Sequence, residues 1–267
     1  MIAALRHLTR ASPTMMRVAW AEIVAYRAEM VIWILTATMP LVMLALWNSA
    51  ASDGPIGAYG QVEFGRYFAI NLVVRQLTGC WVMWELNQAI RTGGLSSWLL
   101  RPMHPLAFNL FETLAALPFR LIVLLPLVGA MFWWRPEIAF VPPLETVALF
   151  AVSVSLSLAL TFLIQCLFGV LCFWFEQSMG LFQAYFAVWA ILSGYFLPEG
   201  LLPPAIARVS AWLPFHASLG APIDLLMGVD STPLRTLALQ GGWVLAVGLL
   251  VRALWGAGVR RYGAYGA

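Results

Sequence analysis

Six long apolar runs divide this chain, and no other feature constrains its fold as strongly. The runs are Met30 to Trp47, Tyr67 to Trp84, Phe108 to Trp134, Leu144 to Phe175, Met179 to Leu197 and Leu237 to Leu254. Charged residues make up only 10% of the 267 residues, whereas a soluble domain carries about a quarter of its residues as charges. A helix of about 20 apolar residues crosses a bilayer because it satisfies its own backbone hydrogen bonds. The sequence therefore predicts an all-α, polytopic membrane protein with six transmembrane helices.

The segments outside the six runs complete one predicted domain, residues 1–267. Residues 1–29 alternate arginines with apolar side chains, a pattern typical of an amphipathic helix in the membrane interface. Residues 30–258 form the predicted six-helix membrane region, and residues 259–267 form a cytoplasmic tail. Between spans five and six, prolines divide the stretch Pro198 to Thr236 into pieces too short to cross. We expect these pieces to be exterior re-entrant helices that are covered by protein.

The arginines predict the orientation, because loops on the cytoplasmic side of a membrane carry an excess of basic residues. With a cytoplasmic N-terminus, that side carries nine arginines, namely Arg6, Arg10, Arg17, Arg27, Arg91, Arg101, Arg252, Arg260 and Arg261. The opposite side carries four, namely Arg66, Arg135, Arg208 and Arg235. This bias predicts that both termini are cytoplasmic.

All fifteen basic residues are arginine, which excludes one class of enzyme. A phosphate-binding loop of the Walker type requires a lysine that reaches the nucleotide phosphates, so this chain is not an ATPase of that class. The arginines form no basic stripe, so nucleic acid is not an expected partner. His7, His104 and His216 lie in separate regions and form no H-E-x-x-H motif. The sequence therefore predicts no catalytic, metal-binding or cofactor-binding residue.

Four charged residues in or near spans two and three are candidates for a substrate path, namely Arg75, Glu85, Glu112 and Arg120. A charge at that depth costs about 2.5 to 3.5 kcal/mol on insertion scales, so it faces a partner or a wet cavity rather than lipid. For Arg75, two interpretations stay open: it lines the path of the transported molecule, or it forms a structural ion pair or extends to the membrane surface. Glu112 and Arg120 lie too far apart to pair directly, and each is expected to contact a neighbouring helix.

Small polar side chains inside the spans are expected to serve packing. Ser153, Ser155 and Ser157 in span four are interpreted as hydrogen-bonding contacts between helices rather than as a ligand site. Cys80, Cys166 and Cys172 lie in apolar segments and are interpreted as core residues.

The turn after span two is the most informative stretch of the sequence. Gly93 and Gly94 let the chain leave the span, a short apolar helix follows, and Pro102 helps to fix its exit. This helix would present Trp98 to Leu100 at the cytoplasmic membrane surface. It serves either as an interfacial anchor or as a contact for a soluble partner, and the residues alone leave both possibilities open.

This turn resembles the signature of type-2 ABC exporter permeases, in a branch of uncharacterised bacterial permeases. In that branch, a glycine-led helix ending in a leucine-leucine-basic-proline run lies between spans two and three, as it does here within Arg91 to Leu106, and the resemblance implies a coupling helix over Gly93 to His104. Ser193 to Pro198 resembles the end of span five in that family, and Trp212 to His216 resembles its leucine-proline-phenylalanine element. The tail Arg260 to Ala267 is similar to the basic, tyrosine- and glycine-rich end of the branch.

The resemblance implies a permease subunit of an ATP-driven exporter in the bacterial inner membrane. The permease would pair with a second permease, related or identical, and dock on a separate ATP-binding cassette subunit. That subunit would hold ATP and Mg²⁺, so the chain itself would bind no cofactor and would not be an enzyme. The family's ATPase-coupling contacts fall here on Gly93, Gly94, Leu95, Trp98, Leu99, Leu100, Arg101, Pro102, His104 and Glu176. The re-entrant segment falls on Gly194, Pro198, Pro214 and Phe215.

Two other functions remain as alternatives. A secondary transporter or channel that works without ATP would show inverted repeats or broken helices with paired charges at mid-membrane, and the sequence shows neither clearly. A membrane scaffold protein would need no transport path at all. Apolar spans with few charges suit an amphipathic or lipid-like cargo, but they do not identify the substrate.

Overall fold

The computed structural model describes residues 39–262 apart from Pro102, Glu176 and Gln177, and also the isolated positions 17, 20, 21 and 25. The described residues form helices and contain no β-strand, which confirms the predicted all-α class. Apart from the isolated positions, the predicted interfacial helix of residues 1–29 lies outside the described residues. The same holds for the start of the first predicted span and for most of the tail.

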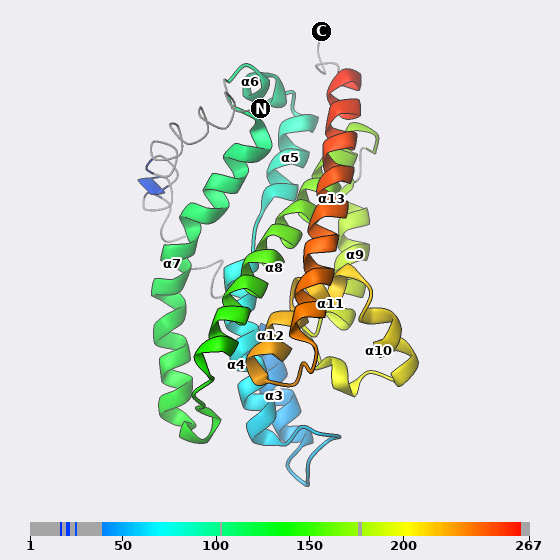
Figure 1. Cartoon of the computed structure of the whole chain (residues 1–267). Coiled ribbons are helices and arrows are strands. Elements are labelled where there is room, and N and C mark those ends of the chain that lie inside the picture. The colour runs from blue at the N-terminus through cyan, green and yellow to red at the C-terminus, as the bar shows by residue number, and fades with distance from the viewer. Residues whose placement is uncertain are drawn as a thin grey trace.

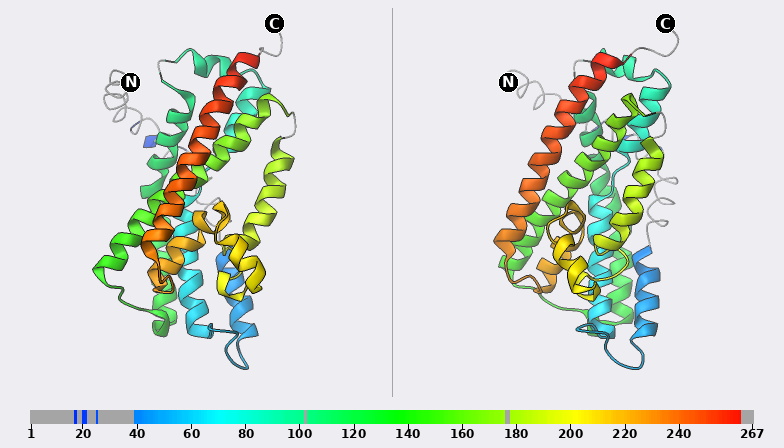
Figure 2. Two further views of the ribbon diagram at one scale, coloured as in Figure 1. Left: turned by 45° about the vertical axis from the view of Figure 1, so that its right-hand side comes forward. Right: turned by 90° about the vertical axis from the view of Figure 1, so that its right-hand side faces the viewer.

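The helices follow one another along the chain as labelled in Figure 1. They are α3 (Met39–Ala50), α4 (Gln61–Thr78), α5 (Val82–Arg91), α6 (Leu95–Leu99), α7 (Pro105–Trp134), η1 (Pro136–Ile138), α8 (Leu144–Val170), η2 (Leu171–Phe173), α9 (Ser178–Leu192), η3 (Glu199–Leu201), α10 (Pro204–Ser210), α11 (Pro214–Ser218), α12 (Gly220–Met227) and α13 (Pro233–Arg261). Figure 2 shows α6 and the C-terminal end of α13 at one end of the bundle, with the short helices α10 to α12 nearer the other end.

Within the described part, three helices are long and apolar enough to cross a membrane: α7, α8 continued by η2, and α13. The helices α3 and α9 are apolar but shorter. Large apolar side chains on α7 point outward, since Ile122 is 62% exposed and Leu125 is 63% exposed. Such outward apolar faces suit lipid, because bilayer tails are as apolar as a protein core. The chain is therefore a multi-pass membrane protein, while the count of six spans stays a prediction.

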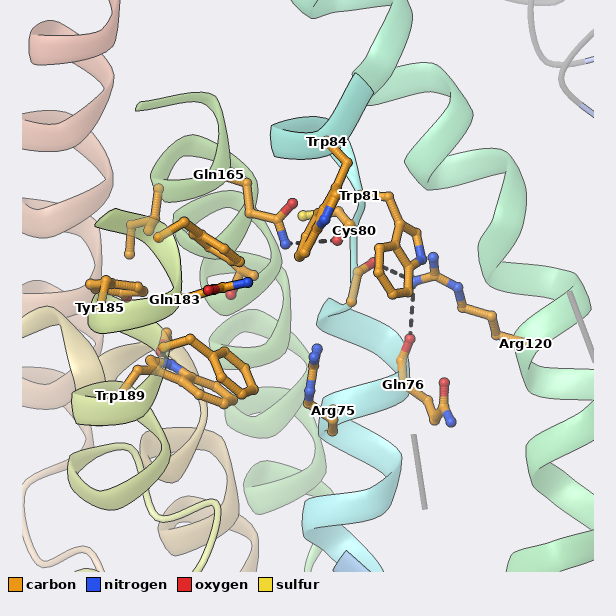
Figure 3. Close-up of a pocket in the computed structure, with 16 residues that line it drawn as sticks. Arg75, Gln76, Cys80, Trp81, Trp84, Arg120, Gln165, Gln183, Tyr185 and Trp189 are labelled. Atoms are coloured by element: carbon orange, nitrogen blue, oxygen red, sulfur yellow. Dashed lines mark hydrogen bonds between the residues drawn. The ribbon is translucent and has the colours of Figure 1, made fainter. Parts of the chain in front are cut away.

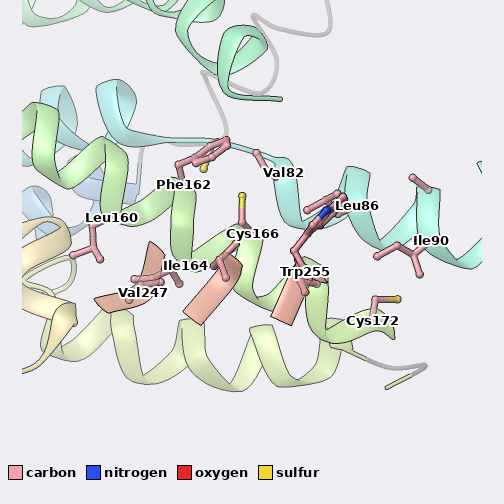
Figure 4. Close-up of a cluster of buried hydrophobic side chains, with 14 of the residues drawn as sticks. Val82, Leu86, Ile90, Leu160, Phe162, Ile164, Cys166, Cys172, Val247 and Trp255 are labelled. Atoms are coloured by element: carbon pink, nitrogen blue, oxygen red, sulfur yellow. The ribbon is translucent and has the colours of Figure 1, made fainter. Parts of the chain in front are cut away.

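The helix α8 lies at the centre of the bundle and packs against α4, α5, α12 and α13. One apolar core joins α5, α8 and α13 and contains Leu86, Cys166 and Val247 (Figure 4). The backbones approach closely there, because a Cβ atom at Gly169 would lie 2.8 Å from Leu86. A second core joins α4, α9 and α12 around Phe64. Cys80, Cys166 and Cys172 are all buried, which confirms that the three thiols are core residues.

Span two is interrupted, which corrects the prediction of one continuous helix from Tyr67 to Trp84. The helix α4 ends at Thr78 and α5 begins at Val82. Gly79 between them has an extended backbone, with φ −64° and ψ 138°. The run of apolar residues gave no sign of this interruption, because a broken span is as hydrophobic as a continuous one. The backbone groups that the break leaves without helical partners bond to side chains of other helices, as described below.

A buried amide on α13 connects three helices. Gln240 is fully buried; it accepts a hydrogen bond from the Ser153 hydroxyl at 2.9 Å and donates to Ser157 Oγ at 3.0 Å and to the Ala217 carbonyl at 2.8 Å. These bonds confirm the interhelical role expected for Ser153 and Ser157. Ser155 instead is exposed and donates to the Ala151 carbonyl of its own helix.

Replacing Gln240 with methionine is expected to lower the free energy of unfolding by about 1 to 3 kcal/mol, because it leaves buried polar groups unsatisfied. The measurement is the thermal unfolding midpoint of the purified protein in detergent. Gln88→Met on the exposed face of α5 is the control and should leave the midpoint nearly unchanged. An equal midpoint for the two variants would contradict this account of Gln240.

A tight turn after α9 starts the segment that leads to α13. Gly194 adopts a left-handed backbone with φ +88°. Its carbonyl oxygen accepts hydrogen bonds from the Tyr67 hydroxyl at 2.8 Å and from the Asn71 side-chain amide at 2.9 Å. Both donors belong to α4, so this turn ties the segment after α9 to the first half of span two.

Candidate functional site

Arg120 of α7 stabilises the break in span two. Its guanidinium donates to the Gln76 carbonyl at 3.2 Å and also to the Gly79 carbonyl. Arg120 is only 6% exposed, and among the described residues no carboxylate lies within ion-pair distance of it. The last carbonyls of a helix carry a partial negative charge, which suits a cation at this place. Arg120 thus contacts a neighbouring helix, as expected, but through backbone carbonyls.

Gln165 of α8 bonds to the other side of the break. Its amide nitrogen donates to the Cys80 carbonyl at 2.7 Å, and its oxygen accepts from the Met83 backbone N–H at 3.3 Å. Non-helical backbone at membrane depth occurs only where protein or a wet cavity provides hydrogen-bond partners. Gln165 is not among the residues predicted from the sequence, although a lone amide in the long apolar run of span four is the kind of signal that marks such a partner.

A cavity of about 350 Å³ lies beside the break, between α4, α5, α8 and α9. Its aromatic lining comes from both sides: Phe182, Tyr185, Phe186 and Trp189 belong to α9, and Trp81 and Trp84 lie at the break and on α5. The polar lining includes Arg75, Arg120, Gln165 and Gln183 (Figure 3). The cavity therefore combines a large apolar surface with a few polar groups, which is the usual character of a small-molecule site.

Arg75 occupies the last turn of α4 and carries its charge at the cavity. Its guanidinium carbon lies 5.5 Å from the ring centre of Trp189 and 5.9 Å from that of Tyr195. Its Nε atom is buried without a hydrogen-bond partner. No carboxylate among the described residues lies within ion-pair distance, so the ion-pair interpretation of Arg75 finds no support there.

The two arginines converge on one point of the chain. A Cβ atom at Gly79 would lie 3.4 Å from Arg120 Nη1 and 3.5 Å from Arg75 Nη1. Both cations therefore face the break and the same cavity, although 45 residues separate them in the sequence. Figure 3 shows Arg75 between the aromatic side chains of α9 and the break, with Arg120 on the far side of it.

The two acidic candidates do not line this cavity. Glu85 is exposed on the first turn of α5, and Glu112 is half-buried on α7. Each has interactions of its own, so neither is an unpaired charge. Of the four residues proposed for a substrate path, the structure brings together the two arginines and leaves the two glutamates elsewhere.

The predicted coupling residues form a short helix, α6, across one end of the bundle. Gly93 makes the turn before it with a left-handed φ of +79°. Leu95 is fully buried and Trp98 is half-buried against the first core, so both side chains point inward. Leu99 is 38% exposed and Leu100 is 88% exposed. The residue best placed to meet a partner is therefore Leu100, rather than Trp98.

The residues after α6 attach it to the bundle. The Arg101 guanidinium lies 5.5 Å from the ring centre of Phe108, and the His104 ring lies 5.0 Å from that of Trp255. His104 Nδ1 accepts a hydrogen bond from the Leu106 N–H at 3.2 Å, and burial lowers the pKa of this imidazole, which favours the neutral form that the bond requires. Pro102 and Glu176, the other predicted coupling residues, lie outside the described residues.

The predicted re-entrant residues lie in the segment between α9 and α13. Gly194 makes the turn described above, Pro198 precedes η3, and Pro214 begins α11. Phe215 packs against the second core, with its ring centre 5.5 Å from that of Tyr185. The segment forms short helices as expected, while its depth in the bilayer stays a prediction.

Apolar helices, an interrupted span and a largely apolar cavity with a few polar groups beside the interruption are features of α-helical membrane transport proteins. The sequence model of the ABC-2 family transporter proteins matches residues 34–266, and the chain belongs to this family. It is therefore a transmembrane permease of ABC-type transport. Permeases of this family are in general not catalytic themselves and associate with an ABC ATP-binding subunit. No curated protein matches the chain significantly.

Proposed function

We propose that this chain is the permease of an ATP-driven exporter in a bacterial inner membrane, and that α6 receives the motion of a separate ATP-binding subunit. A second permease, identical or related, would complete the transport path, and both termini would be cytoplasmic. The main support for a coupling role is the contrast in exposure between the two ends of α6. Buried Leu95 anchors it in the bundle while Leu100 points away from the protein.

The position of α5 supports a mechanical link between α6 and the cavity. At one end, α5 continues through Thr92 to Gly94 into α6, and at the other end it meets the break at residues 79–81. A push on α6 moves α5 relative to α4, with the non-helical residues of the break as the hinge. The cavity would then change shape, because Trp84 belongs to α5 and Arg75 to α4, on opposite sides of the hinge. Such a push requires that α6 binds two states of the ATPase with different free energies.

The cavity also supports a class of cargo. Arg75 and Arg120 supply positive charge, and the aromatic side chains that line the cavity supply apolar surface. We propose that the cargo is amphipathic and places an anionic group near Arg75. Arg120 already donates to backbone carbonyls, whereas Arg75 has a buried Nε atom without a hydrogen-bond partner among the described residues, so Arg75 is the cation that we assign to the anionic group.

Replacing Arg75 with glutamine is expected to weaken binding of hexyl phosphate about tenfold or more, because a charge-assisted hydrogen bond contributes about 1.5 to 3 kcal/mol. The probe is the fluorescence of the cavity tryptophans, with the purified protein in lipid nanodiscs. Hexyl trimethylammonium, which has the same tail and the opposite charge, is the ligand control, and the exposed Arg208→Gln is the protein control. Equal affinity of wild type and Arg75→Gln for hexyl phosphate would contradict the assignment.

Co-purification tests the exporter proposal against its alternatives. The tagged permease is isolated from its native membrane in mild detergent, and the associated proteins are identified and quantified. An ATP-binding subunit in stoichiometric amount supports the exporter. Its absence, together with transport that persists without ATP, would favour a secondary transporter; the broken span is the one feature that such a transporter shares. Absence of both would favour a scaffold role.

A further inference from the structure

We infer that the segment between α9 and α13 contains a binding site for a divalent transition-metal cation such as Zn²⁺, formed by Glu199, His216 and Asp224. The Nε2 atom of His216 lies 2.9 Å from Glu199 Oε2 and 3.0 Å from Asp224 Oδ2. All three donor atoms lie within 4.8 Å of one another. The site is separate from the cavity at the break, and the inference does not depend on ATP-driven export.

The backbone around His216 holds the three side chains together. They come from η3, α11 and α12, which are short helices that carry one donor each. A Cβ atom at Gly220 would lie 2.4 Å from the imidazole Cδ2 and 2.7 Å from its Nε2. The ring thus lies directly against the backbone of α12. Asp224 follows one turn after Gly220 on the same face of that helix, which directs its carboxylate toward the ring.

Hydrogen bonds within the cluster do not satisfy all the oxygen atoms of its two carboxylates. The single proton on His216 Nε2 is shared between two carboxylate oxygens, and Glu199 Oε1 is buried without a hydrogen-bond partner among the described residues. The three side chains are only 15% to 18% exposed, so the two negative charges are poorly solvated. A divalent cation would neutralise both carboxylates, which a single imidazolium cannot do.

The donor set and its spacing suit zinc. Zn²⁺ binds imidazole nitrogen and carboxylate oxygen at about 2.0 to 2.2 Å in a tetrahedral arrangement, which requires donor atoms about 3.3 to 3.5 Å apart. Small side-chain movements would bring the observed 2.9 and 3.0 Å separations to these values. Ca²⁺ and Mg²⁺ prefer oxygen ligands in larger number, so one imidazole and two carboxylates favour a transition metal.

An adjoining cavity gives the ion access and room for a fourth ligand. This cavity, of about 240 Å³, is lined by the three donors and by other polar residues that include Asp230, Thr232 and Arg235. Water from this space would complete the coordination. A bound cation would connect η3 to α11 and α12, so it would stabilise the folded segment by mass action.

Metal titration of the purified protein tests this inference. The protein in nanodiscs is treated with a chelator, dialysed, and titrated with ZnCl₂ by calorimetry and with CoCl₂ by visible absorption. The expected result is one saturable site per chain, with the absorption bands of four-coordinate Co²⁺ and a higher thermal unfolding midpoint with Zn²⁺. His216→Gln is expected to weaken Zn²⁺ binding at least about 100-fold, since loss of a mere supporting partner of a ligand already costs roughly 10- to 100-fold.

Matched variants separate this site from adventitious binding. Asp230→Asn changes the same cavity without removing a ligand, and His104→Gln removes an imidazole elsewhere; both should leave Zn²⁺ affinity unchanged. If His216→Gln does not fold, Glu199→Gln keeps the shape of the side chain and should still weaken binding. The inference is overturned if the wild type binds no Zn²⁺ saturably, or if neither ligand variant changes the affinity. The cluster would then be a protonated histidine between two carboxylates.

Discussion

Replacing Leu100 with aspartate is expected to reduce recovery of the ATP-binding subunit with the permease about 30-fold or more, and to abolish ATP-driven transport. Leu100 caps the C-terminal end of α6 and is 88% exposed, so the change disturbs no internal packing of the described bundle. The few hot-spot residues near the centre of an interface cost about 2 kcal/mol or more when they are truncated, and we assign Leu100 to that group. A buried carboxylate at the contact would add a desolvation cost.

The measurement compares the amount of ATP-binding subunit that co-purifies with each tagged permease at equal membrane abundance. Leu234→Asp is the matched control, since Leu234 is 76% exposed at the start of α13, at the other end of the bundle. Trp98→Asp is a poorer test because Trp98 packs against the first core and its loss destabilises the fold. Undiminished co-purification and transport with Leu100→Asp would remove α6 as the coupling element.

Replacing Gly194 with alanine is expected to destabilise the protein by about 2 to 5 kcal/mol. A Cβ atom there would lie 2.3 Å from the Tyr67 hydroxyl oxygen, a distance at which the backbone or the ring must move. The left-handed φ of +88° adds about 1 to 2 kcal/mol for a residue with a side chain, and overpacking a buried site costs about 1 to 3 kcal/mol. We expect a much lower unfolding midpoint and lower abundance in the membrane.

A second substitution separates the steric clash with Tyr67 from the cost of the left-handed backbone. Tyr67→Phe removes the oxygen that the new methyl group would strike, and the next atom of the ring lies 3.6 Å from the Cβ position. Tyr67→Phe also removes the hydrogen bond to the Gly194 carbonyl, so the comparison is made within that background: Gly194→Ala should cost less stability in Tyr67→Phe than in the wild type, with the backbone cost remaining. Gly129→Ala on α7 is the control, because no atom lies within 4 Å of its Cβ position. Equal stability of Gly194→Ala and Gly129→Ala would show that this turn is not under steric constraint.

The short helix α6 shows how much a sequence motif predicts before the packing is known. The glycine pair and the Trp98 to Leu100 run indicated a short helix after span two, and α6 is that helix. The same motif gave equal weight to its three apolar side chains. Only the packing of α6 on the bundle distinguishes Trp98, which points inward, from Leu100, which points outward.

Packing also decides which of the four charged candidates for a substrate path lie at the cavity. Four charges in spans two and three were conspicuous because charge is costly in lipid. The sequence could not pair them, since their positions relative to one another depend on how α4, α5 and α7 pack. Arg75 and Arg120 lie close together because span two is broken at Gly79, and the Arg120 guanidinium donates to the backbone carbonyls that the break leaves without helical partners. Neither glutamate reaches the cavity.

The sequence by itself was enough to predict that this protein lies in a lipid bilayer and that it resembles a family of permeases. Apolar runs of membrane length required helices in lipid, the absence of lysine excluded a Walker-type ATPase, and short motifs indicated the permease family. Only the tertiary structure decided where span two breaks, which charges share a cavity, and that Glu199, His216 and Asp224 meet. The physical reason is that lipid is as apolar as a protein core, so a spanning helix such as α8 is hydrophobic on every side. Its sequence therefore does not tell which face meets lipid and which meets another helix.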